Sequence, residues 1–193
     1  MVLHLPSFLI PGRDNTHPSH SGKQTLPAGQ EVFLDLDILV VSKTDPHGHI
    51  TYVNRAFMRL SGYAEQALLG QPHNIVRHPG MPRCLFQLMW NTIQGGKDSF
   101  VYPINMVSDN NYHWTFSHIT LSFDPQGAII AYHAHGRAPA RAAVEGIIPL
   151  YTALLAEEAH HADPEQGMIT SLTLLPDFLA WKGSGYDEFV LSL

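Results

Sequence analysis

One segment, residues 71–82, constrains the fold of this chain more than any other. Its sequence, QPHNIVRHPGMP, contains three prolines, two histidines and one arginine. Each proline fixes its own φ and biases the preceding residue away from the helical region. The segment is therefore predicted to form short turns that hold polar side chains at fixed angles, and we expect a ligand to bind there.

The chain before this segment alternates between strands and short helices. Residues 37–44 and 49–53 are rich in β-branched and apolar residues and flank a turn of Asp, Pro, His and Gly, so they are predicted to be strands. Helices are predicted after Asn54, which can cap the first of them, and over residues 64–69 and 82–94.

The next part of the chain is rich in strands. Residues 99–107 are predicted to be a strand in which Pro103 marks a bulge or an edge. Residues 112–123 alternate apolar with polar side chains, and residues 128–136 follow after a turn, so both are predicted to be strands. This order predicts an α+β fold in which one antiparallel sheet carries helices on one face, with a pocket between sheet and helices.

Three regions are predicted along the chain. Residues 1–30 are rich in Pro, Gly, Ser and His and are expected to be a flexible tail, because they have few apolar side chains to bury. The histidines of this tail match no zinc pattern, so no metal site is expected. Residues 31–140 form the predicted α+β domain, and residues 141–193 a C-terminal helical extension.

Within the extension, a helix is predicted over residues 142–160. Residues 168–181 are expected to be a short apolar element broken by Pro176, with the last eight residues free of the fold. The helix carries an apolar stripe that needs a cover, either its own domain or a partner: Ile147, Leu150, Tyr151 and Leu154. We expect a homodimer or a signalling protein partner.

Composition limits the function classes that remain. The formal net charge of −6 and the absence of basic runs argue against nucleic acid as a partner. The single cysteine, Cys84, allows no internal disulfide, which fits a reducing cytoplasm. No stretch approaches the roughly 20 apolar residues of a membrane span, and residues 1–10 make a poor signal peptide, so a cytoplasmic location is expected.

Catalysis is not expected from these residues. The chain has no nucleophile elbow, no phosphate-binding loop and no pair of histidines four apart on a helix. We therefore expect a protein that is not an enzyme.

The turn segment also carries a family resemblance. Residues 71–79, followed by Met81, Pro82 and Trp90, resemble the motif of the PAS sensor domain of aerotaxis receptors. The resemblance covers roughly residues 35 to 155 and includes three further segments: 50–57, 61–63 and 149–154. It implies a PAS fold with a five-stranded antiparallel sheet, a bound FAD, and a role in sensing redox state or oxygen.

The resemblance also implies cofactor-binding residues. In the family, the positions of Arg77 and His78 support flavin binding, and a guanidinium fork suits the oxygens of a diphosphate. The alternative is that Arg77 pairs with a surface carboxylate and that His78 caps a turn. Asn54 and Asn105 match positions whose amides serve the flavin site, although Asn105 could instead face water on an edge strand.

Three more residues are candidates on their own chemistry. His73 could bind a ligand or satisfy a backbone carbonyl. Phe86 and Trp90 lie four apart on one helical face and could wall an isoalloxazine ring or serve as plain core.

The chain departs from the family pattern where the family has acidic, basic or Trp residues: Gly80, Ser99, Ile104, Met106, Val107 and Gly136. Two alternatives to FAD therefore stay open. One is a PAS interaction or dimerisation module without a cofactor. The other is a haem sensor, which needs an imidazole facing a dry cavity, and its candidate ligands are His73, His78, His118, His133 and His135. Strand alternation puts His133 and His135 on one face, but the sequence does not say which face that is.

Overall fold

The computed structural model describes residues 29–107, 110–180 and 185–193. The predicted tail lies outside the described residues up to position 28, as do its histidines and Trp181. Near the start of the described residues, Val32 N–H donates to the carbonyl of Tyr112 at 2.7 Å.

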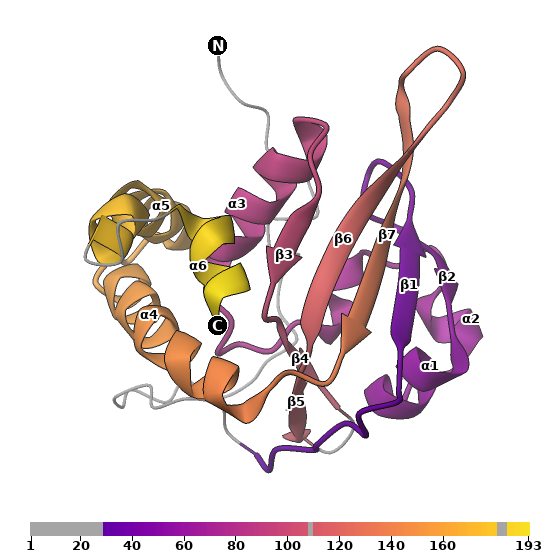
Figure 1. The fold of residues 1–193 in the computed structure, drawn as a ribbon, viewed down its shortest axis with the longest axis horizontal. Helices are drawn as coiled ribbons and strands as arrows, with labels where there is room; N and C mark the ends of the chain where they lie inside the picture. Colours follow the sequence, from indigo (N-terminus) through magenta and orange to yellow (C-terminus); the bar gives the residue numbers. More distant parts are fainter. Residues whose placement is uncertain (1–28, 108–109, 181–184) are drawn as a thin grey trace.

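The centre of the molecule is an antiparallel sheet of five strands (Figure 1). The strands are β1 (Val40–Thr44), β2 (Ile50–Val53), β3 (Ser99–Val101), β6 (Phe116–Phe123) and β7 (Ile129–Arg137). Their order across the sheet is β2-β1-β7-β6-β3, so the last strand of the sheet lies in its middle. The predicted α+β class, with one five-stranded antiparallel sheet, is confirmed.

Two of the predicted strands are each divided in two. Pro103 ends β3, and the chain resumes as β4 (Ile104–Met106), which pairs with β5 (Tyr112–Trp114) in a separate two-stranded sheet. Proline has no N–H to donate to a ladder, but the carbonyl of Pro103 accepts from Thr115 N–H at 3.2 Å. The break at Thr115 therefore lies beside the break at Pro103. At these two breaks the chain passes from the main sheet into the separate sheet of β4 and β5.

Four short helical elements follow β2 and cover one face of the sheet (Figure 1). They are α1 (Arg55–Ser61), α2 (Glu65–Leu68), the 3₁₀ turn η1 (His73–Val76) and α3 (Arg83–Gln94). Asn54 caps α1 as predicted, and Gly62 ends it with φ 75°. The proline-rich segment forms η1 and the turn into α3, so it lies at the border between the sheet and its helical cover.

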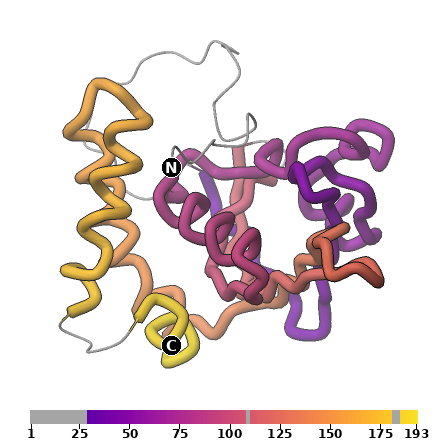
Figure 2. Tube along the Cα trace, turned by 90° about the horizontal axis from the view of Figure 1, so that it is seen from above, coloured from indigo at the N-terminus to yellow at the C-terminus, as the bar shows by residue number. Residues whose placement is uncertain are grey.

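The C-terminal extension is a group of three helices: α4 (Arg141–Ala159), α5 (Pro164–Ala180) and α6 (Tyr186–Ser192). Figure 2 shows them beside α3, on the side away from α1 and α2. The prediction that Pro176 breaks a short element was wrong, because α5 runs through it to Ala180. The prediction of a free C-terminus was also wrong, because α6 buries Phe189 and Val190 beside β3.

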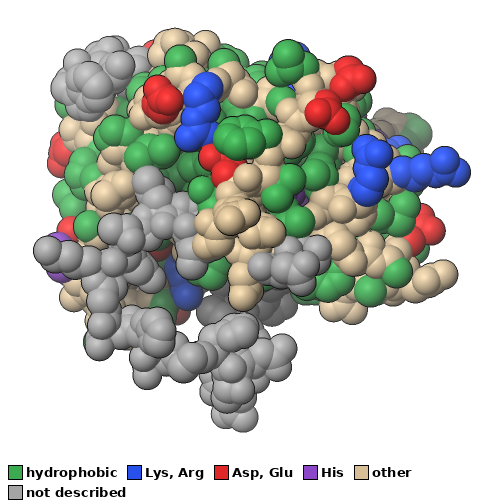
Figure 3. Space-filling view, turned by 90° about the horizontal axis from the view of Figure 1, so that it is seen from below, with side chains coloured by type: hydrophobic (Ala, Val, Ile, Leu, Met, Phe, Trp, Pro, Cys, Tyr) green, Lys and Arg blue, Asp and Glu red, His purple; other side chains and the backbone are tan. Residues whose placement is uncertain are grey.

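The apolar stripe of α4 is covered within the chain. Ile147, Tyr151 and Leu154 are fully buried, and the hydroxyl of Tyr151 donates to the carbonyl of Tyr102 at 2.8 Å. Of the two covers expected for this stripe, its own chain is therefore the one observed, and any partner must use another surface. Lys, Arg, Asp and Glu side chains are scattered among apolar ones on the face shown in Figure 3. Within the described ranges, no helix is long and apolar enough to cross a membrane.

Candidate ligand cavity

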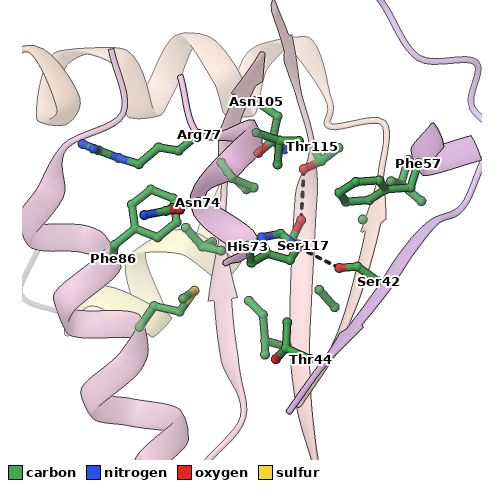
Figure 4. A pocket seen from close by; sticks show the side chains of 18 of the residues that line it. Ser42, Thr44, Phe57, His73, Asn74, Arg77, Phe86, Asn105, Thr115 and Ser117 are labelled. Atoms are coloured by element: carbon green, nitrogen blue, oxygen red, sulfur yellow. Dashed lines mark hydrogen bonds between the residues drawn. The ribbon is translucent and has the colours of Figure 1, made fainter. Parts of the chain in front are cut away.

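A cavity of about 230 Å³ lies between the sheet and its helical cover (Figure 4). We call the face of the sheet that borders it the inner face, and the opposite one the outer face. The inner face is contributed by alternate residues of the central strands, as the two-residue period of a strand requires: Val40, Ser42 and Thr44 of β1, Ser117 and Ile119 of β6, and Tyr132, Ala134 and Gly136 of β7.

The sheet wall of the cavity is polar for a buried surface. Ser42, Thr44, Thr115 and Ser117 are all buried and line the cavity with hydroxyl groups. The hydroxyls of Thr115 and Ser117 are 3.0 Å apart and hydrogen-bonded to each other. These residues were not predicted as site residues, because a buried hydroxyl is recognised only when the face of the strand is known.

The helical wall is apolar and aromatic. Phe86 and Trp90 of α3 both line the cavity, together with Met89 and Ile93. Trp90 packs edge-on against Tyr132 of the inner face, with ring centroids 5.4 Å apart and an interplanar angle of 83°. The predicted aromatic pair thus serves as core and as cavity wall at once.

Arg77 follows η1 and lines the cavity, and Figure 4 shows its guanidinium on the side of Phe86, away from the hydroxyls of Thr115 and Ser117. One guanidinium nitrogen, Nη2, donates to the carbonyl of Met81 at 2.6 Å, and the group lies 5.4 Å from the centroid of the Phe86 ring. Its Nε–H is buried and has no hydrogen-bond partner among the described residues. Burial, together with the nearby Arg83, lowers the pKa of Arg77 to about 10, so the group stays charged at neutral pH.

His73 also lines the cavity, and its Nε2 is 2.8 Å from the hydroxyl of Ser42. The ring packs edge-on against Phe57, with centroids 5.8 Å apart. Burial lowers the pKa of His73 to about 4, which keeps the imidazole neutral at pH 7. His73 is thus a hydrogen-bonding group of the wall, held in place by Ser42 of β1.

Asn105 and His113 form the end of the cavity at the β4–β5 hairpin. They are cross-strand partners, and the backbone of Arg77 bridges to that of Asn105. His113 is only 3% exposed, burial lowers its pKa to about 4, and its Nδ1 has no hydrogen-bond partner among the described residues. His113 was not predicted as a site residue, because alternation between Tyr112, His113 and Trp114 does not reveal which side is buried.

Two of the predicted site residues do not line this cavity. Asn54 uses its amide within the fold: Oδ1 accepts from Phe57 N–H at 2.9 Å and from Val41 N–H at 3.1 Å, and Nδ2 donates to Leu39 at 2.7 Å. His78 uses Nδ1 to accept from Gly80 N–H at 2.9 Å, which is the turn-capping alternative considered for it. Both side chains hydrogen-bond within the fold and do not line the cavity.

The five histidines considered as haem ligands lie in different places relative to the cavity. His118, His133 and His135 lie on the outer face, since their strand neighbours Ser117, Ile119, Tyr132, Ala134 and Gly136 line the cavity on the inner face. His118 contacts Asp98 at 2.7 Å, and His133 contacts Ser122 at 2.7 Å. Of the five, only His73 reaches the cavity. Among the described residues, no group of three or more His, Cys, Asp or Glu is arranged to hold a metal ion.

Comparisons with known proteins bear on the family and the fold. A family model described as PAS fold matches residues 40–134. The chain is 30% identical over 154 residues to the aerotaxis receptor of Escherichia coli (strain K12), across 77% of this chain and 30% of the receptor. It is 32% identical over 99 residues to the nitrogen fixation regulatory protein of Klebsiella pneumoniae, across 51% of this chain and 20% of that protein.

A solved structure, described as an RNA-binding light-oxygen-voltage receptor, shares the fold. It aligns with a TM-score of 0.50 and 18% identity, across 63% of this chain and 34% of that one. This likeness concerns the fold alone. The chain spans 30% and 20% of the lengths of the two curated relatives above.

Proposed function

Since this chain carries a PAS domain of the aerotaxis-receptor family, we propose that it is a sensor of redox state or oxygen that binds FAD in the cavity between sheet and α3. One observation carries the proposal. The cavity has a hydroxyl-lined sheet wall, an aromatic helical wall, and two lining residues with a buried polar atom that has no hydrogen-bond partner among the described residues: Arg77 Nε and His113 Nδ1. Such atoms are costly to bury unless a bound group satisfies them.

The cavity fits one part of FAD better than the whole of it. Its 230 Å³ lie below the roughly 300–1,000 Å³ of pockets that enclose a complete ligand. A flat ring system with one polar and one apolar edge suits a space with one polar and one aromatic wall. Two cations, Arg77 and Arg83, also line the cavity, and guanidinium groups suit the phosphates that follow the ring in FAD.

When bound, the flavin would supply an electron-accepting ring whose charge and hydrogen bonding change on reduction. The hydroxyls of Ser42, Thr115 and Ser117 can each turn to donate or to accept, so the sheet wall can follow such a change. The aromatic wall would exclude water from the ring. Neutral His73 can likewise donate or accept, depending on its tautomer.

A change at the bound ring can be transmitted to the C-terminal extension through a residue of the cavity wall. Met168 of α5 is buried and lines the cavity, although it belongs to the C-terminal extension. α5 packs against α3 and α4, so a shift at the ring would reach the extension by direct contact. We propose that a signalling partner or a second copy of the chain responds to that shift, using a surface other than the buried stripe of α4.

The test is the absorbance of the purified protein before and after incubation with FAD, supported by thermal shift. We expect flavin bands that stay with the protein, and a melting temperature that rises with FAD concentration. A Soret band would show that the bound cofactor is haem rather than FAD. A colourless protein that FAD neither tints nor stabilises would favour an interaction module without a cofactor.

A variant tests the role of Arg77. Arg77→Ala should retain FAD about tenfold or more weakly, because it removes a buried charge that suits phosphate oxygens. Riboflavin, which lacks phosphates, should be affected much less. Equal retention of FAD by variant and wild type at matched thermal stability would remove Arg77 from the site.

A further inference from the structure

The first turn of α3 receives a carboxylate from the C-terminal extension. Oε1 of Glu158, near the end of α4, accepts a hydrogen bond from Cys84 N–H at 2.9 Å. α3 has no acidic residue in its own first turn, and its N-cap residue, Pro82, makes no side-chain cap. The free N–H groups at the start of a helix attract negative charge. The extension therefore supplies the charge that the sequence of α3 lacks.

Two cations lie at the same end of α3. Arg83 is the first residue of the helix, and Arg77 donates through Nη2 to the carbonyl of Met81, just before the helix begins. Burial and the nearby Arg83 lower the pKa of Arg77, whereas the nearby Glu158 raises it. The buried Nε–H of Arg77 has no hydrogen-bond partner among the described residues, so the group keeps a donor for a further anion.

Glu158 is held in place by α5. A Cβ atom on Gly167 would lie 2.6 Å from the carbonyl oxygen of Glu158, so α5 lies directly against the backbone of α4 there. The next residue, Met168, is buried and lines the same cavity as the two arginines. We call residues 158–168 the α4–α5 corner. These contacts place the corner at the end of the cavity where the arginines lie.

The corner lies where the phosphates of a bound FAD would go. The cavity of about 230 Å³ suits the ring rather than the whole molecule. Guanidinium groups and the N–H groups of a helix start are the usual partners of phosphate. Glu158 already occupies the N–H of Cys84, and its charge repels a phosphate. A flavin without phosphates meets neither obstacle.

We propose, building on the flavin function above, that Glu158 is an autoinhibitory carboxylate, which takes the place of a phosphate at the start of α3 until the phosphates of FAD displace it. Binding of FAD then moves the α4–α5 corner, whereas riboflavin fills the cavity and leaves the corner in place. Glu158 thereby sets the preference between flavins with and without phosphates. It also couples occupation of the cavity to the C-terminal extension.

The first experiment compares Glu158→Gln with Glu165→Gln in the full chain. Glutamine keeps the size of the side chain and an oxygen for Cys84 N–H, but removes the charge. Glu165 is an exposed acid in the first turn of α5 and does not line the cavity. Binding of FAD and of riboflavin is measured by flavin fluorescence, and folding by thermal unfolding.

The expected result is a gain of affinity for one ligand. Glu158→Gln should bind FAD about five- to tenfold more tightly than wild type, with a smaller gain at high salt, because a repulsive charge is removed. Its affinity for riboflavin should stay within about twofold of wild type, because riboflavin carries no phosphate. Glu165→Gln should bind both flavins as wild type does.

The only cysteine of the chain reports on the corner itself. Cys84 is fully buried, its Sγ accepts from the hydroxyl of Ser171 of α5 at 3.4 Å, and burial raises the pKa of its thiol to about 12. Movement of the corner would uncover this thiol. FAD should therefore raise the rate of its reaction with DTNB by about threefold or more, while riboflavin leaves the rate unchanged. A rate that FAD leaves unchanged or lowers would overturn the movement of the corner.

The outcomes distinguish the two proposals. If wild type binds FAD and Glu158→Gln binds it no more tightly, or gains equally for FAD and riboflavin, the autoinhibitory role is overturned and the flavin function stands. FAD binding that appears only in Glu158→Gln would support the role. If neither protein binds either flavin, the flavin function fails and the role of Glu158 fails with it.

Discussion

The two faces of the sheet are built from neighbouring residues of the same strands, yet they differ in kind. Along β7, Tyr132, Ala134 and Gly136 face the cavity, whereas His133 and His135 face outward. The inner face combines small or hydroxyl-bearing residues with a few large apolar ones. The outer face carries long polar side chains such as His118, His133 and His135 in addition to the small hydroxyl of Ser122. Along these strands, the long polar side chains therefore lie away from the cavity.

The histidines show the same division. His73 and His113 are next to the cavity, and burial lowers the pKa of each to about 4. On the outer face, His118 contacts Asp98, and His133 contacts Ser122. Burial, together with the nearby Lys43 and His135, also lowers the pKa of His133. The faces therefore differ in the partners of their imidazoles: those at the cavity lie in its wall, and His118 and His133 bond to polar neighbours on the outer face.

The largest difference between the faces should be in stability. Tyr132→Ala removes a ring that is 5% exposed and packs on Trp90, and should lower the free energy of unfolding by about 3 kcal/mol or more. His133→Ala, one residue along the strand, should cost less than about 1 kcal/mol. Chemical denaturation of both variants measures this directly. Similar losses would show that the outer face is packed against something as closely as the inner one.

A smaller effect should appear with pH. Between pH 6.5 and about 4, the unfolded chain binds protons at the positions of His73 and His113 that the folded chain does not bind. The free energy of unfolding should therefore fall as pH drops through this window, by about 2 kcal/mol per histidine between pH 7 and pH 5. Above pH 6.5 both states are neutral at these residues, and this contribution disappears.

The variant that checks this is His113→Gln, which keeps a polar side chain and removes the titration. It should lose less stability than wild type between pH 7 and pH 5, by about the amount assigned to one histidine. Unfolding by urea at the two pH values gives the comparison. An identical loss in variant and wild type would mean that His113 is not buried as a neutral group.

The division between the faces explains how far the sequence could predict this molecule. Periodicity and turn residues were sufficient for the positions of the sheet residues, for the helices up to residue 94 and for the helix over residues 142–160, which is observed as α4, because these signals are local. The turns around Pro103 and Thr115 were not predicted, since dividing two strands depends on where the chain meets the rest of the sheet. The course of α5 through Pro176 and the docking of α6 depend on tertiary burial, which overrides the local signal.

The site was predictable only in part for the same reason. Arg77, His73, Phe86, Trp90 and Asn105 stand out by residue type and spacing, and all five line the cavity. Asn54 and His78 have the same signals, but their side chains hydrogen-bond to the backbone of the fold and do not line the cavity. The missed residues, Ser42, Thr115, Ser117 and His113, carry no signal until the inner face is known, because one step along a strand exchanges inside for outside.

The smallest expected effect concerns His118, the residue directly after Ser117. It contacts Asp98 at 2.7 Å and stacks on Phe100 with ring centroids 4.4 Å apart, but both members of the pair are partly solvent-exposed. Exposed pairs contribute roughly 0–1 kcal/mol, so His118→Ala should change the free energy of unfolding by less than about 1 kcal/mol. Flavin binding should be unaffected, in contrast to Ser117→Ala, which removes a hydroxyl from the wall of the cavity. Titration of FAD into the two variants makes this the sharpest form of the comparison, because the substituted residues are adjacent in sequence. Weaker binding in His118→Ala would mean that the outer face of the sheet takes part in the site, and the separation of the two faces would have to be abandoned.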